Sequence, residues 1–378
     1  MKLEKLNTYL RNLCGKYGIP SWECKVLYQG EVVLDAKSES YDCKRRHYFI
    51  YSMTKLVTCV AAMRLVEDGM LSLDDKVSAY LPDFAEMYVQ KGKVVTPTTK
   101  ALTVRHLISM QGGYGYEIDM EDLVYTIRDN PNASTQEIAK ALSKRPLKFE
   151  PGEGFGYSLC YDILGAVIEV ASGKSLGEYF KEKIFTPLEM DNTTFKLTSQ
   201  MREKLAPFYR YNHELGRPIE MVPASNEYIF TQNYESGGAG LISTFDDYFK
   251  FAVTLLNGGV TESGYCLLQK ESIAQIHKRC MTDEMLYGYD RYQQWGTGYS
   301  FGVRSQVDYS RCPQFMSDEN FELTGAAGSC AFWDLKNKLT FVYFQHAVGI
   351  KEVSNVVHHK IRDLIYEDIE NENYFGRK

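Results

Sequence analysis

The 378-residue sequence predicts an α+β fold, with an antiparallel sheet flanked by helices and a second, mostly helical lobe. Strand-like patterns lie near both ends, at residues 22–36 and beyond residue 295, whereas residues 71–230 are loop-rich and helical in pattern. We therefore expect the first and last strands to share one sheet. This gives a discontinuous sheet lobe of residues 1–70 and 231–378, and a helical lobe of residues 71–230.

The N-terminal segment predicts an amphipathic helix, because Leu3, Leu6, Leu10 and Leu13 recur at helical spacing. It lacks the unbroken apolar core of a signal peptide, and no stretch of the sequence approaches the ~20 apolar residues that a membrane span needs. The nine cysteines include no C-x-x-C pair, and an odd count without a signal peptide suits reduced thiols. We therefore expect a cytoplasmic protein.

The next elements follow from turn and cap signals. Gln29-Gly30 marks a hairpin turn between two short strands, and an apolar stripe predicts a helix over 52–68 that stops at Gly69. A second helix is expected to start after Asp162, as its N-cap, and to end at Gly173.

The C-terminal third adds three more predicted elements. A helix follows residues 243–247, which resemble a capping box, and ends at residues 257–259. Residues 331–335 and 339–344 read as an antiparallel hairpin, and a final helix is expected from about residue 352 to 371.

Several kinds of chemistry find no support in the sequence. The formal net charge of −6 (43 basic and 49 acidic residues) argues against a nucleic-acid partner, which needs a concentrated basic surface. Neither phosphate-binding glycine motif occurs, there is no H-E-x-x-H, and the seven histidines show no ligand spacing, so we expect no cofactor and no metal.

Ser52 and Lys55 form an S-x-x-K motif at the start of a predicted helix. Residues three apart share one face of a helix, so the two side chains would lie within hydrogen-bond reach. A serine hydroxyl needs a partner that takes its proton, and a lysine can do this where burial or positive potential destabilises its ammonium form.

Two later segments complete a possible site. The hydroxyl of Tyr157 could exchange protons with Lys55, because an ammonium stabilises a phenolate. Leu323-Thr324-Gly325-Ala326 lies on a predicted strand, where a glycine allows close backbone approach and an N–H can donate to an oxyanion. Each segment alone is more simply explained as a packed aromatic residue or a β-bulge.

Taken together, these motifs resemble the serine β-lactamase and penicillin-binding protein superfamily. The likeness is strongest to its class C-like branch, which includes the family VIII carboxylesterases. The matching segments occur in one order over roughly residues 20–350, namely 49–58, 65–75, 80–84, 102–108, 157–165, 237–244 and 323–329.

The resemblance implies a role for each residue and a site between the two lobes. Ser52 would be the acylated nucleophile, Lys55 its proton acceptor, and Tyr157 the partner acid/base. The backbone N–H groups of Ser52 and Ala326 would form the oxyanion hole. Thr324 and Gly325 would line the edge of the substrate pocket. Tyr114, Tyr116, Trp295 and Tyr299 are further candidates for its rim, although packing is the expected role of each.

Two departures from the family pattern bear on the substrate. Leu159 stands where many members have Asn, and Leu323 stands where the third motif usually opens with Lys. Leucine provides neither an amide nor a cation, so a carboxylate-bearing substrate loses support, and an apolar acyl or alcohol group gains it. Leu159 and Leu323 are therefore counted among the substrate-binding residues.

The sequence therefore predicts an acyl-transfer hydrolase that acts on small esters. A β-lactamase or D,D-peptidase-like enzyme acting on an amide is the second reading, and a binding or regulatory protein with weak turnover is the third. If Lys55 must be neutral or Tyr157 ionised, activity should rise on an alkaline limb. The sequence assigns no oligomeric state.

Overall fold

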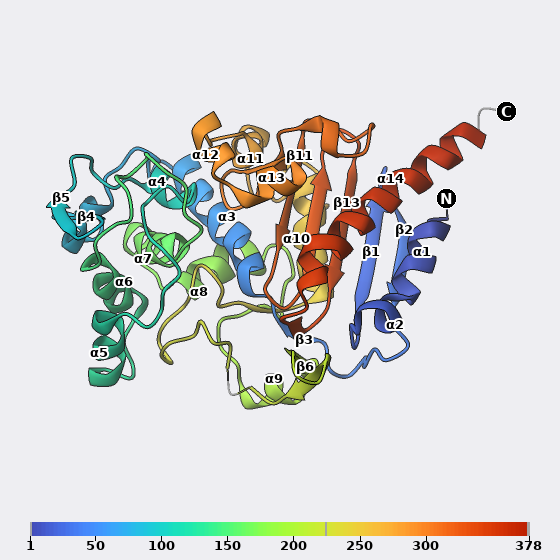
Figure 1. The fold of residues 1–378 in the computed structure, drawn as a ribbon, viewed down its shortest axis with the longest axis horizontal. Helices are drawn as coiled ribbons and strands as arrows, with labels where there is room; N and C mark the ends of the chain where they lie inside the picture. The colour runs from blue at the N-terminus through green and yellow to red at the C-terminus, as the bar shows by residue number, and fades with distance from the viewer. Residues whose placement is uncertain (1, 224, 376–378) are drawn as a thin grey trace.

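The sheet at the centre of the protein joins strands from the two ends of the chain (Figure 1). The structure, a computed structural model, describes residues 2–223 and 225–375. The strand order is β2-β1-β13-β12-β11-β10-β9, and all neighbours are antiparallel. Its strands are β1 (Glu23–Tyr28), β2 (Glu31–Lys37), β9 (Thr297–Tyr299), β10 (Arg304–Gln306), β11 (Asn320–Thr324), β12 (Cys330–Asp334) and β13 (Leu339–Phe344).

The pairing of β1 with β13 confirms the prediction that the first and last strands share a sheet, and so confirms the α+β class. Cys24 lies opposite Tyr343 in this pair. The predicted hairpins are also present, with positive φ at Gln29 and Gly30 in the first turn and at Lys338 in the second.

Helices from both chain ends cover one face of the sheet (Figure 1). These are α1 (Glu4–Arg11), α2 (Leu13–Tyr17) and α14 (His358–Phe375). Leu6 and Leu10 of α1 are fully buried in one apolar cluster with Phe341 of β13 and Ile361 of α14. The N–H of Leu6 also donates to Asp368 Oδ2 at 3.0 Å, which ties α1 to α14.

The other face of the sheet packs against α10 (Phe245–Leu256) and α3 (Thr54–Glu67). The indole N–H of Trp333 in β12 donates to the carbonyl of Ala252 in α10 at 2.9 Å. The same apolar cluster continues into the helices of residues 71–230, so a single core joins the sheet to the helical region. The division into lobes at residues 70/71 and 230/231 stays a prediction.

The region between the sheet strands in sequence contains several helices, most of them at the left of Figure 1 and α9 at the bottom. They are α4 (Val104–Ile108), α5 (Glu121–Asp129), α6 (Thr135–Ser143), α7 (Cys160–Ser172), α8 (Leu176–Phe180) and α9 (Ser199–Glu203). Three further helices precede β9, namely α11 (Lys270–His277), α12 (Asp283–Tyr287) and α13 (Asp290–Trp295).

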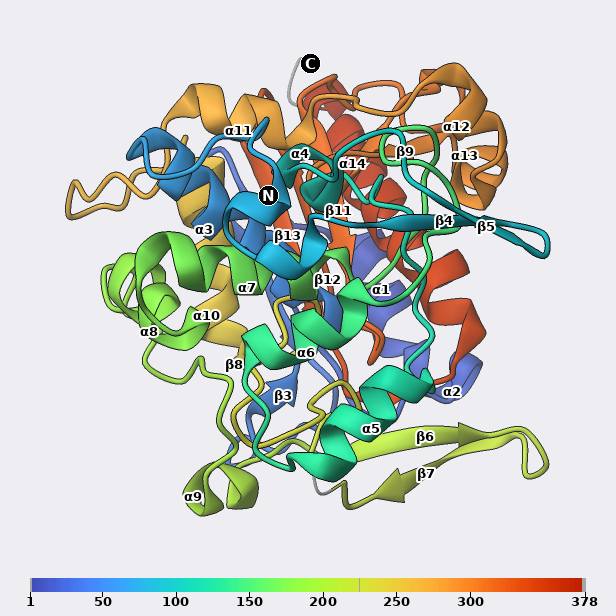
Figure 2. The same cartoon turned by 90° about the vertical axis from the view of Figure 1, so that its left-hand side faces the viewer.

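The structure also contains strands, within residues 71–230 and outside them, that the sequence did not reveal. The hairpins β4–β5 (Tyr88–Lys91 and Val94–Pro97) and β6–β7 (Phe208–Asn212 and Arg217–Met221) extend outward in Figure 2. β14 (Ala347–Val348) pairs in parallel with β6, and β3 (His47–Phe49) pairs with β8 (Ile242–Thr244). Most residues of the two hairpins are exposed, so they lack the buried alternation that marks a strand in sequence.

One predicted helix start needs correction. Helix α7 begins at Cys160 with Leu159 as its N-cap, so Asp162 lies inside the first turn rather than capping it. The helical run that includes α3 begins with the 3₁₀ turn Tyr51–Met53, and the run that ends in α14 begins at residue 351 and passes through a π-helical turn, so both of these starts agree with the prediction. Thr244 caps α10, because its hydroxyl accepts from the N–H of Asp247.

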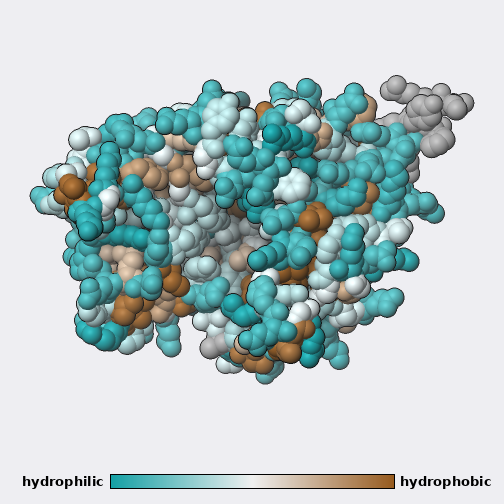
Figure 3. Space-filling view, in the orientation of Figure 1, coloured by the Kyte–Doolittle hydropathy of each residue, from teal (hydrophilic) through white to brown (hydrophobic). Residues whose placement is uncertain are grey.

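Hydrophilic residues cover most of the face shown in Figure 3, and apolar residues form only small groups on it. Among the residues that the structure describes, no helix combines the length and the apolar character that crossing a bilayer requires.

Candidate active site

Ser52 lies in a strained turn between β3 and α3. Tyr51, the residue before it, has a φ of 46°, a left-handed value that few non-glycine residues adopt. Ser52 belongs to the 3₁₀ turn Tyr51–Met53 and is only partly buried, whereas both neighbours are buried. Such strain is held in place only by surrounding structure and is common at functional sites. The turn therefore presents the Ser52 hydroxyl while anchoring the side chains on either side of it.

Lys55 lies one turn further, at the start of α3, and is fully buried. Its Nζ makes three hydrogen bonds, to Ser52 Oγ at 3.1 Å, to Tyr116 OH at 2.9 Å and to the carbonyl oxygen of Gly238 at 2.7 Å. A buried ammonium or amine is costly unless its hydrogen-bonding capacity is met, and these three partners meet it. The predicted contact between Ser52 and Lys55 is thus present.

Two tyrosines pack against Lys55. The ring centroids of Tyr116 and Tyr157 lie 5.4 Å and 4.8 Å from Nζ, and the two rings stack at 5.5 Å with an angle of 16° between their planes. Tyr157 is 38% exposed, and Tyr299 packs edge-on against its other side. Tyr157 therefore reaches the site as predicted, but the contact it makes with Lys55 is through its ring.

Tyr116 is the member of the site that sequence reasoning undervalued. Burial raises the pKa of its hydroxyl well above the ordinary value of 10, and the charges of Tyr157 and Asp162 raise it further. The hydroxyl therefore stays protonated at neutral pH, so it accepts from Lys55 and keeps a proton of its own. The only sequence signal for it was an aromatic residue in the segment after 102–108, where packing was the simpler interpretation.

The other three candidate rim residues are buried or stacked elsewhere. Tyr114 and Tyr299 are 2% and 1% exposed, and the Trp295 ring stacks on His359 with centroids 3.9 Å apart.

Gly325 brings the third motif against the turn that contains Ser52. A Cβ at this position would lie 2.5 Å from the carbonyl oxygen of Ile50, so only glycine allows this approach. The N–H of Gly325 donates to Ser329 O at 2.8 Å, and Ala326, the next residue, is exposed. The structure thus places Gly325 and Ala326 beside the turn that contains Ser52, while the oxyanion hole of Ser52 and Ala326 N–H groups stays a prediction.

The two leucines that depart from the family pattern are core residues in this structure. Leu159 and Leu323 are each 2% exposed, and Thr324 is partly exposed at the end of β11. Contact between a substrate and Leu159, Leu323, Thr324 or Gly325 stays a prediction.

A buried cation that the sequence did not reveal lies beside the third motif. Arg304 of β10 donates through Nη2 to Thr324 Oγ1 at 2.9 Å and through Nε to Glu322 Oε1 at 3.1 Å. Burial alone would raise the pKa of Glu322, but the positive charges of Arg304 and its neighbours hold it at about 2. The third motif thus has Leu323 at the position where the family usually has a lysine, but a guanidinium lies next to Thr324. Glu322 neutralises the charge of that guanidinium.

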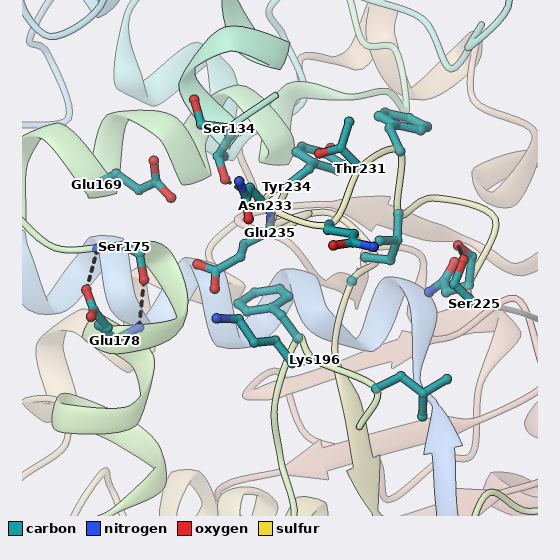
Figure 4. A pocket seen from close by; sticks show the side chains of 18 of the residues that line it. Ser134, Glu169, Ser175, Glu178, Lys196, Ser225, Thr231, Asn233, Tyr234 and Glu235 are labelled. Atoms are coloured by element: carbon teal, nitrogen blue, oxygen red, sulfur yellow. Dashed lines mark hydrogen bonds between the residues drawn. The ribbon is translucent and has the colours of Figure 1, made fainter. Parts of the chain in front are cut away.

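A cavity beside the helical region is separate from this site. It has a volume of about 1220 Å³, and its lining includes Glu169, Glu178, Lys196 and Glu235 but none of Ser52, Lys55 and Tyr157 (Figure 4). Glu169 and Glu235 accept from the first N–H groups of α8, those of Leu176 and Gly177. These carboxylates thus have a structural role at a helix N-terminus. Among the described residues, no cluster of three or more His, Cys, Asp or Glu is arranged to hold a metal.

Comparison with solved structures supports the fold at low sequence identity. The chain matches EstCE1, a hydrolase with promiscuous acyltransferase activity, with a TM-score of 0.78 and 23% identity over 96% of this chain and 98% of that one. It matches a mutant of simvastatin synthase (LovD) from Aspergillus terreus with a TM-score of 0.78 and 20% identity over 98% of both chains.

Among curated proteins, esterase EstB from Burkholderia gladioli is 27% identical over 329 residues, or 80% of this chain and 79% of EstB. The lovastatin esterase from Penicillium rubens is 31% identical over 220 residues, which are 55% of this chain and 54% of that protein. The sequence model of the Beta-lactamase family matches residues 6–362. The order of motifs, the shared fold and this match lead to one conclusion: the chain belongs to the Beta-lactamase family.

Proposed function

We propose that this protein is a serine hydrolase that forms an acyl-enzyme on Ser52, with small carboxylic esters as its substrates. The observation that carries the proposal is the hydrogen bond of 3.1 Å between Lys55 Nζ and Ser52 Oγ, in which the lysine is fully buried. Burial favours the neutral amine, the form that can take the serine proton.

The other two contacts of Lys55 suit this role. A neutral amine has two N–H donors and one lone pair. If the N–H groups donate to Gly238 O and Tyr116 OH, the lone pair faces Ser52 Oγ and accepts its proton. The same three contacts fit the ammonium that forms when Ser52 attacks.

Acylation then proceeds with a simple proton balance. The Ser52 Oγ–carbon bond forms as the hydroxyl proton passes to Lys55, and the bond to the alcohol breaks as that alcohol takes up a proton from the Lys55–Tyr157 pair. In deacylation a water oxygen bonds to the acyl carbon as one water proton passes to the same pair, and the bond to Ser52 Oγ then breaks as the pair returns a proton to Ser52, which releases the acid. N–H groups of Ser52 and Ala326 would stabilise the oxyanion, a contribution of ~3 kcal/mol for each donor.

Esters are the proposed substrates for two reasons. Two curated relatives in the comparison, EstB and the lovastatin esterase, are named as esterases. In addition, the third motif opens with the buried Leu323, and the cation beside it, Arg304, is already paired with Glu322. A substrate carboxylate would have to compete with that pair, whereas an uncharged ester would not.

The test compares wild type, Ser52→Ala and the control Ser263→Ala, whose serine lies on an exposed loop. Each is assayed with p-nitrophenyl acetate and butyrate, a chromogenic cephalosporin and D-alanyl peptides, and each is treated with a serine-directed phosphonate. We expect ester turnover and labelling in wild type and Ser263→Ala, and neither in Ser52→Ala.

The other outcomes decide between the alternatives. Ester turnover that survives in Ser52→Ala contradicts the mechanism. Faster turnover of the cephalosporin or the peptides contradicts the ester assignment and favours a β-lactamase or D,D-peptidase. If no substrate turns over and no label attaches, the chain is a binding protein with this fold.

A further inference from the structure

We infer that Asp162 is a positioning residue for Lys55, acting through Gly238, and that its negative charge sets the pH at which the site becomes active. The inference rests on the proposed function, because it concerns the same pair of Ser52 and Lys55.

Asp162 is buried in the first turn of α7, with 2% of its surface exposed. Its Oδ1 accepts three hydrogen bonds, from Tyr234 OH at 2.5 Å, from Ser236 Oγ at 2.6 Å and from the N–H of Gly238 at 3.3 Å. All three donors come from residues 234–238, the segment that faces Lys55. The carboxylate thus fixes a loop from behind, although its sequence position suggested a helix cap.

Gly238 connects the two charged groups. Its N–H donates to Asp162, while its carbonyl oxygen accepts the shortest hydrogen bond of Lys55, at 2.7 Å. A Cβ on Gly238 would lie 2.5 Å from Asp162 Oδ2, so the carboxylate rests against the backbone of this residue. Since a single residue contacts both side chains, a shift of Asp162 moves an acceptor of Lys55.

Helix α3 holds the same loop from the opposite side. Thr58 Oγ1 donates to the carbonyl of Gly237 at 2.7 Å, and the N–H of Leu241 donates to Thr54 Oγ1 at 3.1 Å. Thr54, Lys55 and Thr58 therefore present one side of α3 to residues 237–241. The loop is clamped between α3 and Asp162, which leaves the Gly238 carbonyl little freedom.

None of the three donors to Asp162 is a cation, because two are hydroxyls and one is a backbone amide. Burial raises the pKa of Tyr116 and of Tyr228, and the negative charge of Asp162 raises both further. Asp162 thus acts electrostatically on the aromatic residues around Lys55. The remaining titratable or charged groups that face the site are Tyr157, Tyr299 and Arg304, which acts on Tyr157.

A negative charge near a lysine favours its ammonium form. The proposed reaction needs the neutral amine of Lys55, so the charge of Asp162 should move the onset of activity to higher pH. Replacing the charge by a neutral group of the same shape should therefore move the alkaline-rising limb of activity to lower pH. Because Gly238 contacts both Asp162 and Lys55, the two groups lie close together, and we expect a shift on the order of one pH unit.

The test measures kcat/KM for p-nitrophenyl butyrate from pH 5 to 10 in wild type, Asp162→Asn and Glu169→Gln. Asparagine keeps an acceptor oxygen for the three donors and removes the charge. Glu169 lies on the same helix but its carboxylate bonds to Leu176 and Gln136, so Glu169→Gln is the matched control. We expect the limb to move to lower pH by about one unit in Asp162→Asn only.

The outcome that overturns the inference is a limb that stays in place in folded Asp162→Asn, or that moves equally in Glu169→Gln. A lower melting temperature or a uniform loss of activity at all pH values, without a shift, also overturns it, because a purely structural role predicts that result. If Asp162→Asn does not fold, Asp162→Ser is measured instead. It also removes the charge and keeps an acceptor oxygen, so the limb must again move to lower pH.

A second readout separates this inference from the proposed function. The rate at which a fluorophosphonate labels Ser52 is followed by mass spectrometry over the same pH range. If wild type is labelled but hydrolyses no ester, the proposed function fails, and the limb of the labelling rate still decides the role of Asp162. If the labelling limb does not shift in Asp162→Asn, the inference fails on its own.

Discussion

The hydroxyl of Tyr116 lies 2.9 Å from Nζ of Lys55, while Tyr157 contacts the same nitrogen through its ring, at 4.8 Å from the ring centroid. The two tyrosines therefore have different relationships to one lysine. Tyr116 fixes its direction through a hydrogen bond, whereas Tyr157 is partly exposed to solvent.

This difference predicts unequal effects of removing the two hydroxyls. Tyr157→Phe should lower kcat/KM for p-nitrophenyl butyrate by about 100-fold or more, since it removes the proposed acid/base. Tyr116→Phe keeps the stacked ring and should cost about 10-fold, the value of one lost hydrogen bond that orients Lys55. Tyr287→Phe, at a tyrosine that is 70% exposed, is the control. A larger loss in Tyr116→Phe than in Tyr157→Phe would exchange the two roles.

The close approach of Gly325 to Ile50 predicts a second result. Gly325→Ala places a methyl group 2.5 Å from a backbone oxygen, so β11 must move away from the Ser52 turn. A displacement of this kind in a catalytic site costs about 100-fold in kcat/KM. Gly15→Ala adds its methyl group where no atom lies within 4 Å and should leave activity unchanged. Full activity in Gly325→Ala would show that the third motif is not needed.

The buried pair of Arg304 and Glu322 predicts a large cost of removing one partner. Glu322→Gln leaves a buried guanidinium without its counter-charge and should lower the free energy of unfolding by about 3–5 kcal/mol. Replacing both residues, as Arg304→Met with Glu322→Leu, should restore much of this loss. Chemical denaturation measures both variants. Asp129→Asn, which removes the partner of the exposed Arg128, should cause no measurable change. If Glu322→Gln lowered the free energy of unfolding no more than the double replacement does, the result would contradict this account.

Acidification should destabilise the protein through His346. Its Nε2 accepts from the N–H of Phe49 at 3.1 Å, and its Nδ1 lies 2.9 Å from Ala206 O, so the ring is neutral and donates through Nδ1. Burial lowers the pKa of His346 to about 4 from an ordinary value of 6.5. The unfolded chain therefore binds the extra proton between pH 6.5 and 4, and stability falls as pH falls through that window.

The expected loss from His346 alone is about 2 kcal/mol between pH 7.5 and 5. His346→Gln should be less stable at pH 7.5 and should lose less on acidification, as measured by urea denaturation at both pH values. His213→Gln, at an exposed histidine, should show the full wild-type fall. An unchanged pH dependence in His346→Gln would exclude this histidine as the cause.

The order of patterns along the sequence was enough to predict the sheet and the contact between Ser52 and Lys55. The patterns of residues 22–36 and 331–344 are short and buried, which is why β1, β2, β12 and β13 were found. The exposed hairpins β4–β5 and β6–β7 were missed, because their pairing is held by backbone hydrogen bonds that leave no apolar alternation.

The partners of Lys55 were only partly predictable, for a physical reason. Ser52 lies three residues away on one helix, so local geometry places it. Tyr116, Gly238 and Arg304 come from separate loops and strands, and only the folded chain shows which of many tyrosines, glycines or arginines lies there. Asp162 shows the same limit: as a residue near a helix start it looked like a cap, but the loop that it binds is more than seventy residues later.

The pairing of β1 with β13 has a consequence for synthesis of the protein. A ribosome makes β1 and the Ser52 turn early, but β13 and the Gly325 segment that packs on Ile50 come near the end. Until then β1 has β2 as its only neighbour in the sheet. We therefore expect the nascent chain to hold an unassembled nucleophile through most of translation, so that polypeptides released before β11 is made carry Ser52 and Lys55 without hydrolytic power.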